Sequence, residues 1–128
     1  LKSSGGNGEL FMKSYGGISL HNQSHGESFM AIMKNRFSGH GLYILDEPEA
    51  ALSPSRQMAM LALMKRLVDQ DSQFIISTHS PILMAYPEAE IIELDETGFR
   101  STPYKETTHY RLTNYFLNNT EQMLKELM

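Results

Sequence analysis

The chain has 128 residues and a mass of 14.5 kDa, with 41% hydrophobic and 20% charged residues, a balance typical of one globular domain. Its 11 basic and 15 acidic residues give a net charge of −4, so the overall charge does not attract nucleic acid or an anionic membrane. Cysteine is absent, which excludes disulfides, thiolate catalysis and thiolate-bound metals. We expect a cytoplasmic protein with no membrane segment, because no apolar run approaches the roughly 20 residues of a spanning helix.

Composition divides the chain near its start. Residues 1–23 are rich in Gly, Ser and Asn and predict an irregular segment, whereas residues 24–128 carry the patterns of a folded domain. The first residues show neither an initiator Met nor a signal peptide, and we expect a piece of a longer chain. A helix is expected from Ser24, because Ser24 and Glu27 have capping-box spacing before an apolar pattern of helical period that ends at Phe37.

The middle of the chain predicts a βαβ unit. Residues 42–45 and 74–76 are short apolar runs, typical of strands buried on both faces. Between them, Ser53 and Pro54 begin a helix that extends to about Gln70. A crossover of this length imposes parallel pairing, so the two strands point the same way.

The last third of the chain predicts a short helix, a hairpin and a helical tail. Pro81 can open a helix through Tyr86, and residues 91–94 and 99–104 read as two strands joined by a turn. The tail is helical from about Thr108, with a break near residues 118–119. The predicted fold class is therefore α/β, with parallel strands in βαβ units, a small terminal hairpin and C-terminal helices.

An acidic pair and an imidazole are the candidate catalytic groups. Asp46 and Glu47 follow the first buried strand, and His79 follows the second. Ligands of open parallel sheets bind beyond the carboxyl ends of the strands, so we expect these side chains at one edge. Asp46 is suited to Mg²⁺, Glu47 to orienting or deprotonating a water, and His79 to a phosphate oxygen. Taken singly, each is more simply a polar turn residue, and only their convergence points to chemistry.

Four motifs in order resemble those of ABC-type P-loop ATPases. They are HNQSHGE at residues 21–27, LYILDEP at 42–48, AALSP at 50–54 and ISTHSP at 76–81, which are similar to the signature motif, Walker B with its catalytic Glu, the D-loop and the switch-His loop. The residues in these motifs are closer to those of soluble AAA-family, RecF-like and SMC-like ATPases than to those of membrane transporters. The resemblance covers roughly residues 15–128 and implies a P-loop NTPase sheet.

This resemblance implies a role for each motif. Asp46 would serve Mg²⁺, Glu47 the hydrolytic water and His79 the γ-phosphate of ATP. Ser24, Gly26 and Glu27 would contact ATP bound to a second subunit, so that two copies sandwich the nucleotides, and Ser53 would lie in the D-loop at that interface. From the residues alone, Ser24 and Glu27 can equally be a plain capping box, and a phosphate at a helix N-terminus is the alternative.

Several features depart from the family pattern. His25 replaces a glycine of the usual signature motif, and Ser53 stands where Asp is usual. The phosphate loop G-x-x-x-x-G-K-[ST] is missing, since Met12 occupies the place of its second glycine before Lys13 and Ser14. We therefore expect the carboxyl-terminal half of an ATPase, whose partner is the missing amino-terminal Walker A half. This chain alone should neither bind ATP tightly nor hydrolyse it.

Two other functions remain open from the sequence. One is an α/β module that uses the same surface only to associate, and the other, ranked lower, is a metal-dependent phosphodiesterase built on Asp46, Glu47 and His79. A nucleic-acid partner is unsupported. The only residues that point to one are three widely spaced basic side chains, Arg100, Lys105 and Arg111. The process coupled to ATP hydrolysis is not encoded in these motifs.

Overall fold

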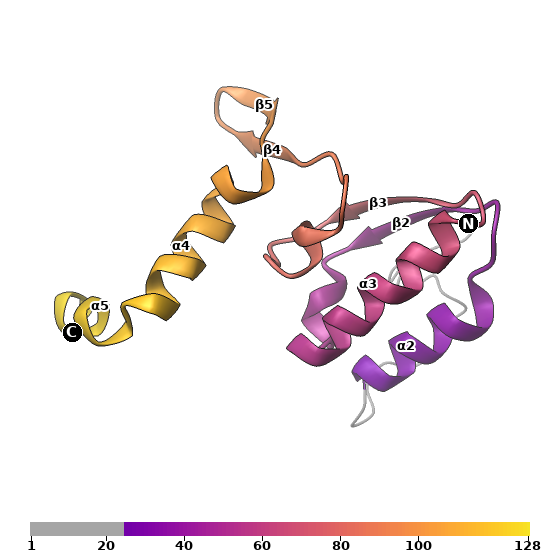
Figure 1. Cartoon of the computed structure of the whole chain (residues 1–128), viewed down its shortest axis with the longest axis horizontal. Coiled ribbons are helices and arrows are strands. Elements are labelled where there is room, and N and C mark those ends of the chain that lie inside the picture. The colour runs from indigo at the N-terminus through magenta and orange to yellow at the C-terminus, as the bar shows by residue number, and fades with distance from the viewer. Residues whose placement is uncertain (1–24) are drawn as a thin grey trace. The chain divides into compact units, whose positions relative to one another are not determined.

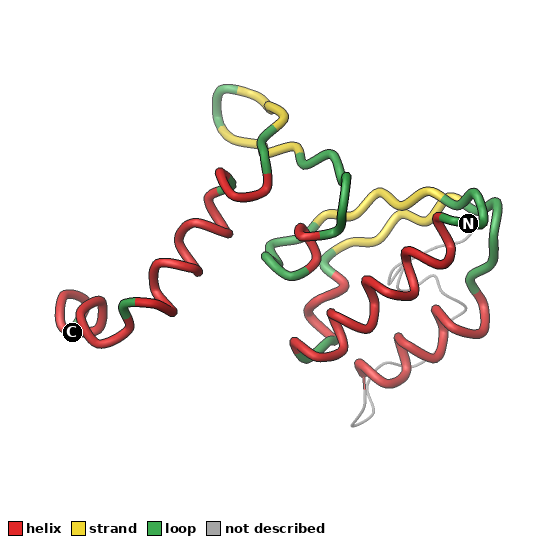
Figure 2. The backbone as a smooth tube through the Cα atoms, viewed as in Figure 1, coloured by secondary structure: helices red, strands yellow, loops and turns green. Residues whose placement is uncertain are grey.

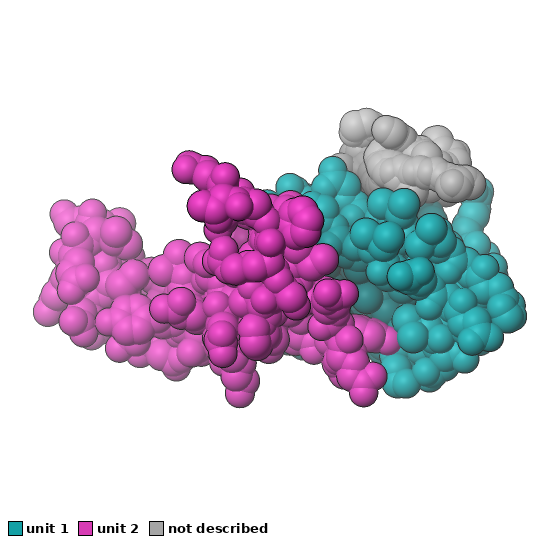
Figure 3. All heavy atoms as spheres, turned by 90° about the horizontal axis from the view of Figure 1, so that it is seen from above, with its two compact units in different colours: residues 1–83 teal, residues 84–128 magenta. Residues whose placement is uncertain are grey.

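The computed structural model describes residues 25–128, so the predicted irregular segment 1–23 and the helix start at Ser24 lie outside the described residues. The chain divides into two compact units, residues 1–83 and residues 84–128, which Figure 3 distinguishes by colour. Each unit has its own secondary structure and is described by itself. The candidate catalytic residues all belong to the first unit.

The first unit contains a parallel pair of strands with helices on one face (Figure 1). Strand β2 (Leu42–Asp46) pairs with β3 (Gln73–Ser77), and helix α3 (Pro54–Val68) forms the crossover between them. Helix α2 (His25–Arg36) packs beside α3. The predicted βαβ unit and its parallel pairing are confirmed, and the α/β architecture is compatible with a P-loop NTPase-like fold.

The core of the first unit lies between the strands and the two helices. It is formed by apolar side chains that recur at helical spacing on α2 and α3 and at one position of β2. These include Phe29, Ile32, Met33, Leu45, Met60, Leu63, Met64 and Leu67. Helix α3 begins where the sequence predicts, since the Ser53 hydroxyl accepts a hydrogen bond from the backbone N–H of Arg56 at 3.3 Å and Pro54 is the first helical residue.

The other face of the two strands is exposed. Leu45 is 4% exposed on the helix side, whereas Leu42, Ile44 and Ile75 are 56%, 63% and 52% exposed. The expectation that both strands are buried on both faces is therefore wrong for this chain. The reason is physical: successive side chains of a strand point to opposite faces, and among the described elements the helices cover only one of them (Figure 2).

The second unit consists of a hairpin and two helices. Strand β4 (Ile92–Asp95) pairs antiparallel with β5 (Gly98–Ser101), followed by α4 (Thr108–Asn118) and α5 (Thr120–Leu127). The predicted hairpin, helical tail and break near residues 118–119 are confirmed. Within residues 25–128, no helix combines the length and the apolar character needed to cross a bilayer.

Three short 3-10 helices complete the part of the chain that the structure describes. They are η1 (Pro48–Ala51) after β2, η2 (Leu83–Ala85) after β3, and η3 (Tyr104–Glu106) before α4. The helix expected from Pro81 to Tyr86 is thus a single 3-10 turn. Its neighbour Ser80 accepts hydrogen bonds from the backbone N–H groups that follow it, which satisfies these donors without a longer helix.

Candidate functional site at the carboxyl ends of β2 and β3

The structure brings the two polar strand ends together. Asp46 is paired with Ser77 at the end of the parallel ladder, and the backbone N–H of Glu47 donates to the Ser77 carbonyl at 2.7 Å. Beyond this point, Nε2 of His79 lies 3.5 Å from a carboxylate oxygen of Glu47. The convergence of an acid and an imidazole, expected from chain topology, is therefore present in the fold.

Glu47 adopts a backbone conformation that side chains usually avoid. Its φ of 49° and ψ of 54° place it in the left-handed region, directly before Pro48 opens η1. For a residue other than glycine, this conformation costs roughly 1–2 kcal/mol. Such strain tends to persist where the surrounding structure fixes it, and functional sites are where it clusters. Here the bond to Ser77 and the 3-10 turn hold Glu47 in place.

The contact between Glu47 and His79 contributes little to stability. The two side chains are 51% and 66% exposed, and their 3.5 Å separation is longer than a strong hydrogen bond. Exposed ion pairs typically contribute about 0–1 kcal/mol. The fold therefore does not need this pair, and both groups are accessible to a ligand at the edge of the sheet.

Glu49 anchors the loop that carries His79, a role that the sequence motifs did not assign to it. One carboxylate oxygen accepts a hydrogen bond from the Thr78 hydroxyl at 2.6 Å, and the other accepts from the backbone N–H of His79 at 2.8 Å. In the sequence, its signal is an acid placed two residues after Glu47 in a turn that Pro48 opens. A bidentate carboxylate of this kind fixes the orientation of the peptide that it binds.

The other predicted site residues divide into those the structure describes and those it does not. Asp46 ends β2 with an exposed side chain, and Ser53 caps α3. Helix α2 begins at His25, but Ser24, the surroundings of Gly26 and the side chain of Glu27 lie outside the described part of the structure. Among the described residues, no group of at least three His, Asp or Glu side chains is arranged to hold a metal ion.

Comparison with known protein families decides the class of the domain. A family model described as the AAA ATPase domain matches residues 15–84, which is more than half of the chain. The chain belongs to the AAA ATPase domain family. The match includes the acidic strand end and His79, so the candidate site lies within the region that this family of ATPase domains shares. No curated protein matches the chain.

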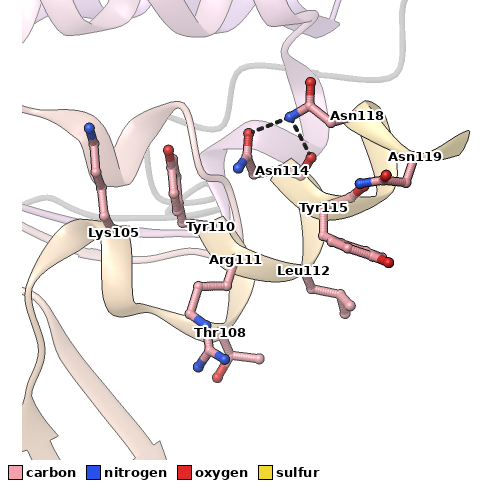
Figure 4. Close-up of a pocket in the computed structure, with 9 residues that line it drawn as sticks. All are labelled: Lys105, Thr108, Tyr110, Arg111, Leu112, Asn114, Tyr115, Asn118 and Asn119. Atoms are coloured by element: carbon pink, nitrogen blue, oxygen red, sulfur yellow. Dashed lines mark hydrogen bonds between the residues drawn. The ribbon is translucent and has the colours of Figure 1, made fainter.

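The second unit holds a separate hollow that contains none of the predicted catalytic residues. It runs along α4 between Lys105 and Asn119, where the Asn118 side-chain amide donates to the backbone and side-chain oxygens of Asn114 at 2.9 Å (Figure 4). The residues that line it come from η3, from α4 and from Asn119 at the end of α4. The hollow is therefore a surface depression along one helix, not a site built from several elements.

A cluster of charged groups in the hairpin has a structural explanation. Hydrogen bonds from Thr97, then from Arg100, lower the pKa of Asp95 to about 2. The backbone N–H of Thr108, first residue of α4, is the main cause of the lowered pKa of Glu93 and donates to it at 2.8 Å. A carboxylate at a helix N-terminus satisfies a free N–H group and interacts favourably with the helix dipole. This cluster joins α4 to the hairpin.

Proposed function

We propose that this AAA ATPase domain is the carboxyl-terminal half of an ABC-type ATPase, which binds and hydrolyses ATP when the half with the phosphate loop is present. The observation that carries the proposal is the 3.5 Å approach of His79 to Glu47 beyond two parallel strands. This edge is where open parallel sheets bind their ligands. The family match supports the ATPase class of the chemistry.

In the proposed site, Glu47 orients or deprotonates the attacking water, and His79 donates a hydrogen bond to the γ-phosphate. A positioned general base typically contributes about 10²–10⁴-fold to a rate. Asp46 fits Mg²⁺, because this ion takes oxygen ligands and is usually held by one or two carboxylates together with substrate phosphates. When bound with ATP, Mg²⁺ supplies charge neutralisation for those phosphates.

The exposed sheet face supports the proposal that a further part of the domain exists. Ile44 lies opposite Ile75 in the parallel register, and both are more than half exposed. Parallel sheets are generally covered on both faces. We infer that the amino-terminal Walker A half covers this face and supplies the backbone N–H groups and the Lys of the phosphate loop.

Two copies of the complete domain would sandwich ATP between them. In this arrangement Ser24, Gly26 and Glu27 of one copy contact the γ-phosphate bound by the other, and Ser53 lies at the interface. A helix N-terminus offers free N–H groups and a partial positive charge, which suits a phosphate from the facing subunit. ATP-driven dimerisation would then be the step coupled to the cellular task.

The variant Glu47→Gln in the intact ATPase tests the proposal. The amide keeps the shape of the side chain but cannot accept the proton of a water, so we expect ATP hydrolysis to fall by about 10²-fold or more. ATP binding should be retained and the dimer should live longer. Glu96→Gln, in the turn of the hairpin, is a matched control that should change neither turnover nor dimer lifetime.

The same experiment separates the enzyme from an association module that does not hydrolyse ATP. An unchanged turnover in Glu47→Gln removes this carboxylate from the chemistry and contradicts the proposal. The chain of 128 residues alone, assayed in parallel, should show no turnover, because Asp46 alone does not retain Mg²⁺ without a phosphate loop that binds the nucleotide. ATP hydrolysis by the purified chain alone contradicts the half-domain assignment.

A further inference from the structure

A buried glutamine lies behind the candidate site. Gln57, in the first turns of α3, is 8% exposed and both ends of its side-chain amide are hydrogen-bonded. Nε2 donates to the carbonyl of Leu52 at 3.1 Å, and Oε1 accepts from the hydroxyl of Ser80. Burying an amide is unfavourable unless it is hydrogen-bonded, and an apolar side chain would suit this core-facing position. The polar side chain therefore serves to tie two loops together.

Ser80 connects Gln57 to the residues on both sides of His79. It is 6% exposed, and its hydroxyl oxygen accepts hydrogen bonds from the backbone N–H groups of Ile82 and Leu83, each at 3.1 Å. Its own N–H donates to the Thr78 hydroxyl oxygen at 3.0 Å. The residues before and after His79 are thus both fixed by side-chain hydrogen bonds.

The other end of the network returns to the segment after Glu47. The Thr78 hydroxyl donates to Glu49 at 2.6 Å, and Glu49 also accepts from the backbone N–H of His79. The carbonyl that Gln57 binds belongs to Leu52, whose N–H donates to the carbonyl of Glu49 at 3.0 Å. A closed set of hydrogen bonds therefore joins residues 49–52 to residues 78–80, and Gln57 and Ser80 are its buried polar members.

We propose that Gln57 is a positioning residue, which through Ser80 and Thr78 fixes His79 relative to the segment 50–53. This inference rests on the proposed function, which assigns His79 to the chemistry and Ser53, the last residue of this segment, to the interface between subunits. The hydrogen bonds of Gln57 to the Leu52 carbonyl and to Ser80 hold the loop of His79 in one arrangement relative to this segment.

A double-mutant cycle in the intact ATPase tests this role. Gln57→Met keeps the length of the side chain and removes both hydrogen bonds, so we expect kcat to fall roughly 10- to 100-fold, the effect of misplacing a catalytic group by about an ångström. The KM for ATP should change by less than about twofold, because the loss concerns the transition state. In the His79→Ala background, Gln57→Met should lower kcat by less than about twofold further, since a positioning residue acts through the group it positions.

Two further variants complete the experiment. Gln57→Leu is close to Gln57→Met in volume, also removes both hydrogen bonds, and should reproduce the same cycle if Gln57→Met fails to fold. Met58→Ala, at an exposed neighbour on α3, should leave kcat unchanged. If the Gln57 variants lower kcat by the same factor with and without His79, Gln57 has a general structural role and the inference is overturned.

The outcomes also separate this inference from the proposed function. Hydrolysis that depends on His79 but not on Gln57 overturns the positioning role alone. Absence of ATP hydrolysis in the intact protein, or a kcat that His79→Ala leaves unchanged, overturns the proposed function and the positioning role with it.

Discussion

One carboxylate oxygen of Glu49 accepts a hydrogen bond from the backbone N–H of His79 at 2.8 Å, and the other accepts one from the hydroxyl of Thr78 at 2.6 Å. Glu49 and His79 are 30 residues apart in the chain, and the parallel pairing of β2 with β3 brings them together. The placement of His79 therefore depends on the turn that follows the neighbouring strand. A substitution of Glu49 should therefore alter the position of His79.

We predict that Glu49→Ala lowers the free energy of unfolding of the chain by about 1–2 kcal/mol. The variant leaves the Thr78 hydroxyl and the His79 N–H without their charged acceptor, and both are accessible enough for water to replace it in part. Urea denaturation followed by circular dichroism measures the difference. Glu90→Ala, at an exposed loop position, is the control, and an equal loss in both variants would contradict the anchoring role.

The hairpin should show a pH dependence that originates at Asp95. Its pKa lies at about 2 instead of 3.8, mainly because Thr97 and then Arg100 donate hydrogen bonds to the ionised carboxylate. A depressed pKa in the folded state means that the stabilisation is complete above the unfolded value and is lost as the pH falls toward 2. The carboxylate is at the surface, so salt should weaken the part of the effect that comes from Arg100.

Thr97→Val isolates the largest cause of that shift. The variant removes the hydroxyl that donates to Asp95 at 2.7 Å and keeps the backbone N–H that donates at 2.9 Å. The pKa of Asp95, followed by NMR titration of its side-chain carbon, should rise toward 3.8 without reaching it. A pKa that stays at its original value would show that the Thr97 hydroxyl is not responsible.

Local pattern and topology were sufficient to predict most of the secondary structure. Ser53 with Pro54 marked the start of α3, and the apolar runs around Ile44 and Ile75 marked the two strands, because capping chemistry and period are local properties. The rule that parallel strands need a crossover then predicted that Glu47 and His79 would meet. None of these steps required knowledge of a distant contact.

The residues that support the site could not be predicted in the same way. Gln57 lies on a helix face where the apolar period is the dominant signal, and its partners are a carbonyl and a hydroxyl that only the folded loops bring near. In the sequence, Glu49 is one more acid in a polar turn, with nothing to distinguish it from its neighbours. Hydrogen bonds between loops depend on tertiary geometry, which a pattern along the chain does not contain.

The exposure of the sheet face also depends on tertiary context, and it yields a prediction that tests the proposed amino-terminal half. Apolar runs such as residues 42–45 predict burial on both faces, yet Ile75 is 52% exposed among the elements that the structure describes. If the amino-terminal half covers this face, burial of Ile75 depends on whether that half is present. The same substitution should then have different consequences in the two forms of the protein.

We predict that Ile75→Thr changes the free energy of unfolding of this chain by less than about 1 kcal/mol, because about half of the side chain is already in water and the β-branched shape is kept. In the intact ATPase, the same change should cost about 2–4 kcal/mol, since it removes buried apolar volume and buries a hydroxyl. Leu45→Ala is the matched control, because Leu45 is 4% exposed on the helix side and should cost about 2–5 kcal/mol in both forms. Denaturant titrations of both forms measure these differences. Equal costs for Ile75→Thr in the two forms would mean that nothing covers this face, and the amino-terminal half would then have to join the strands elsewhere.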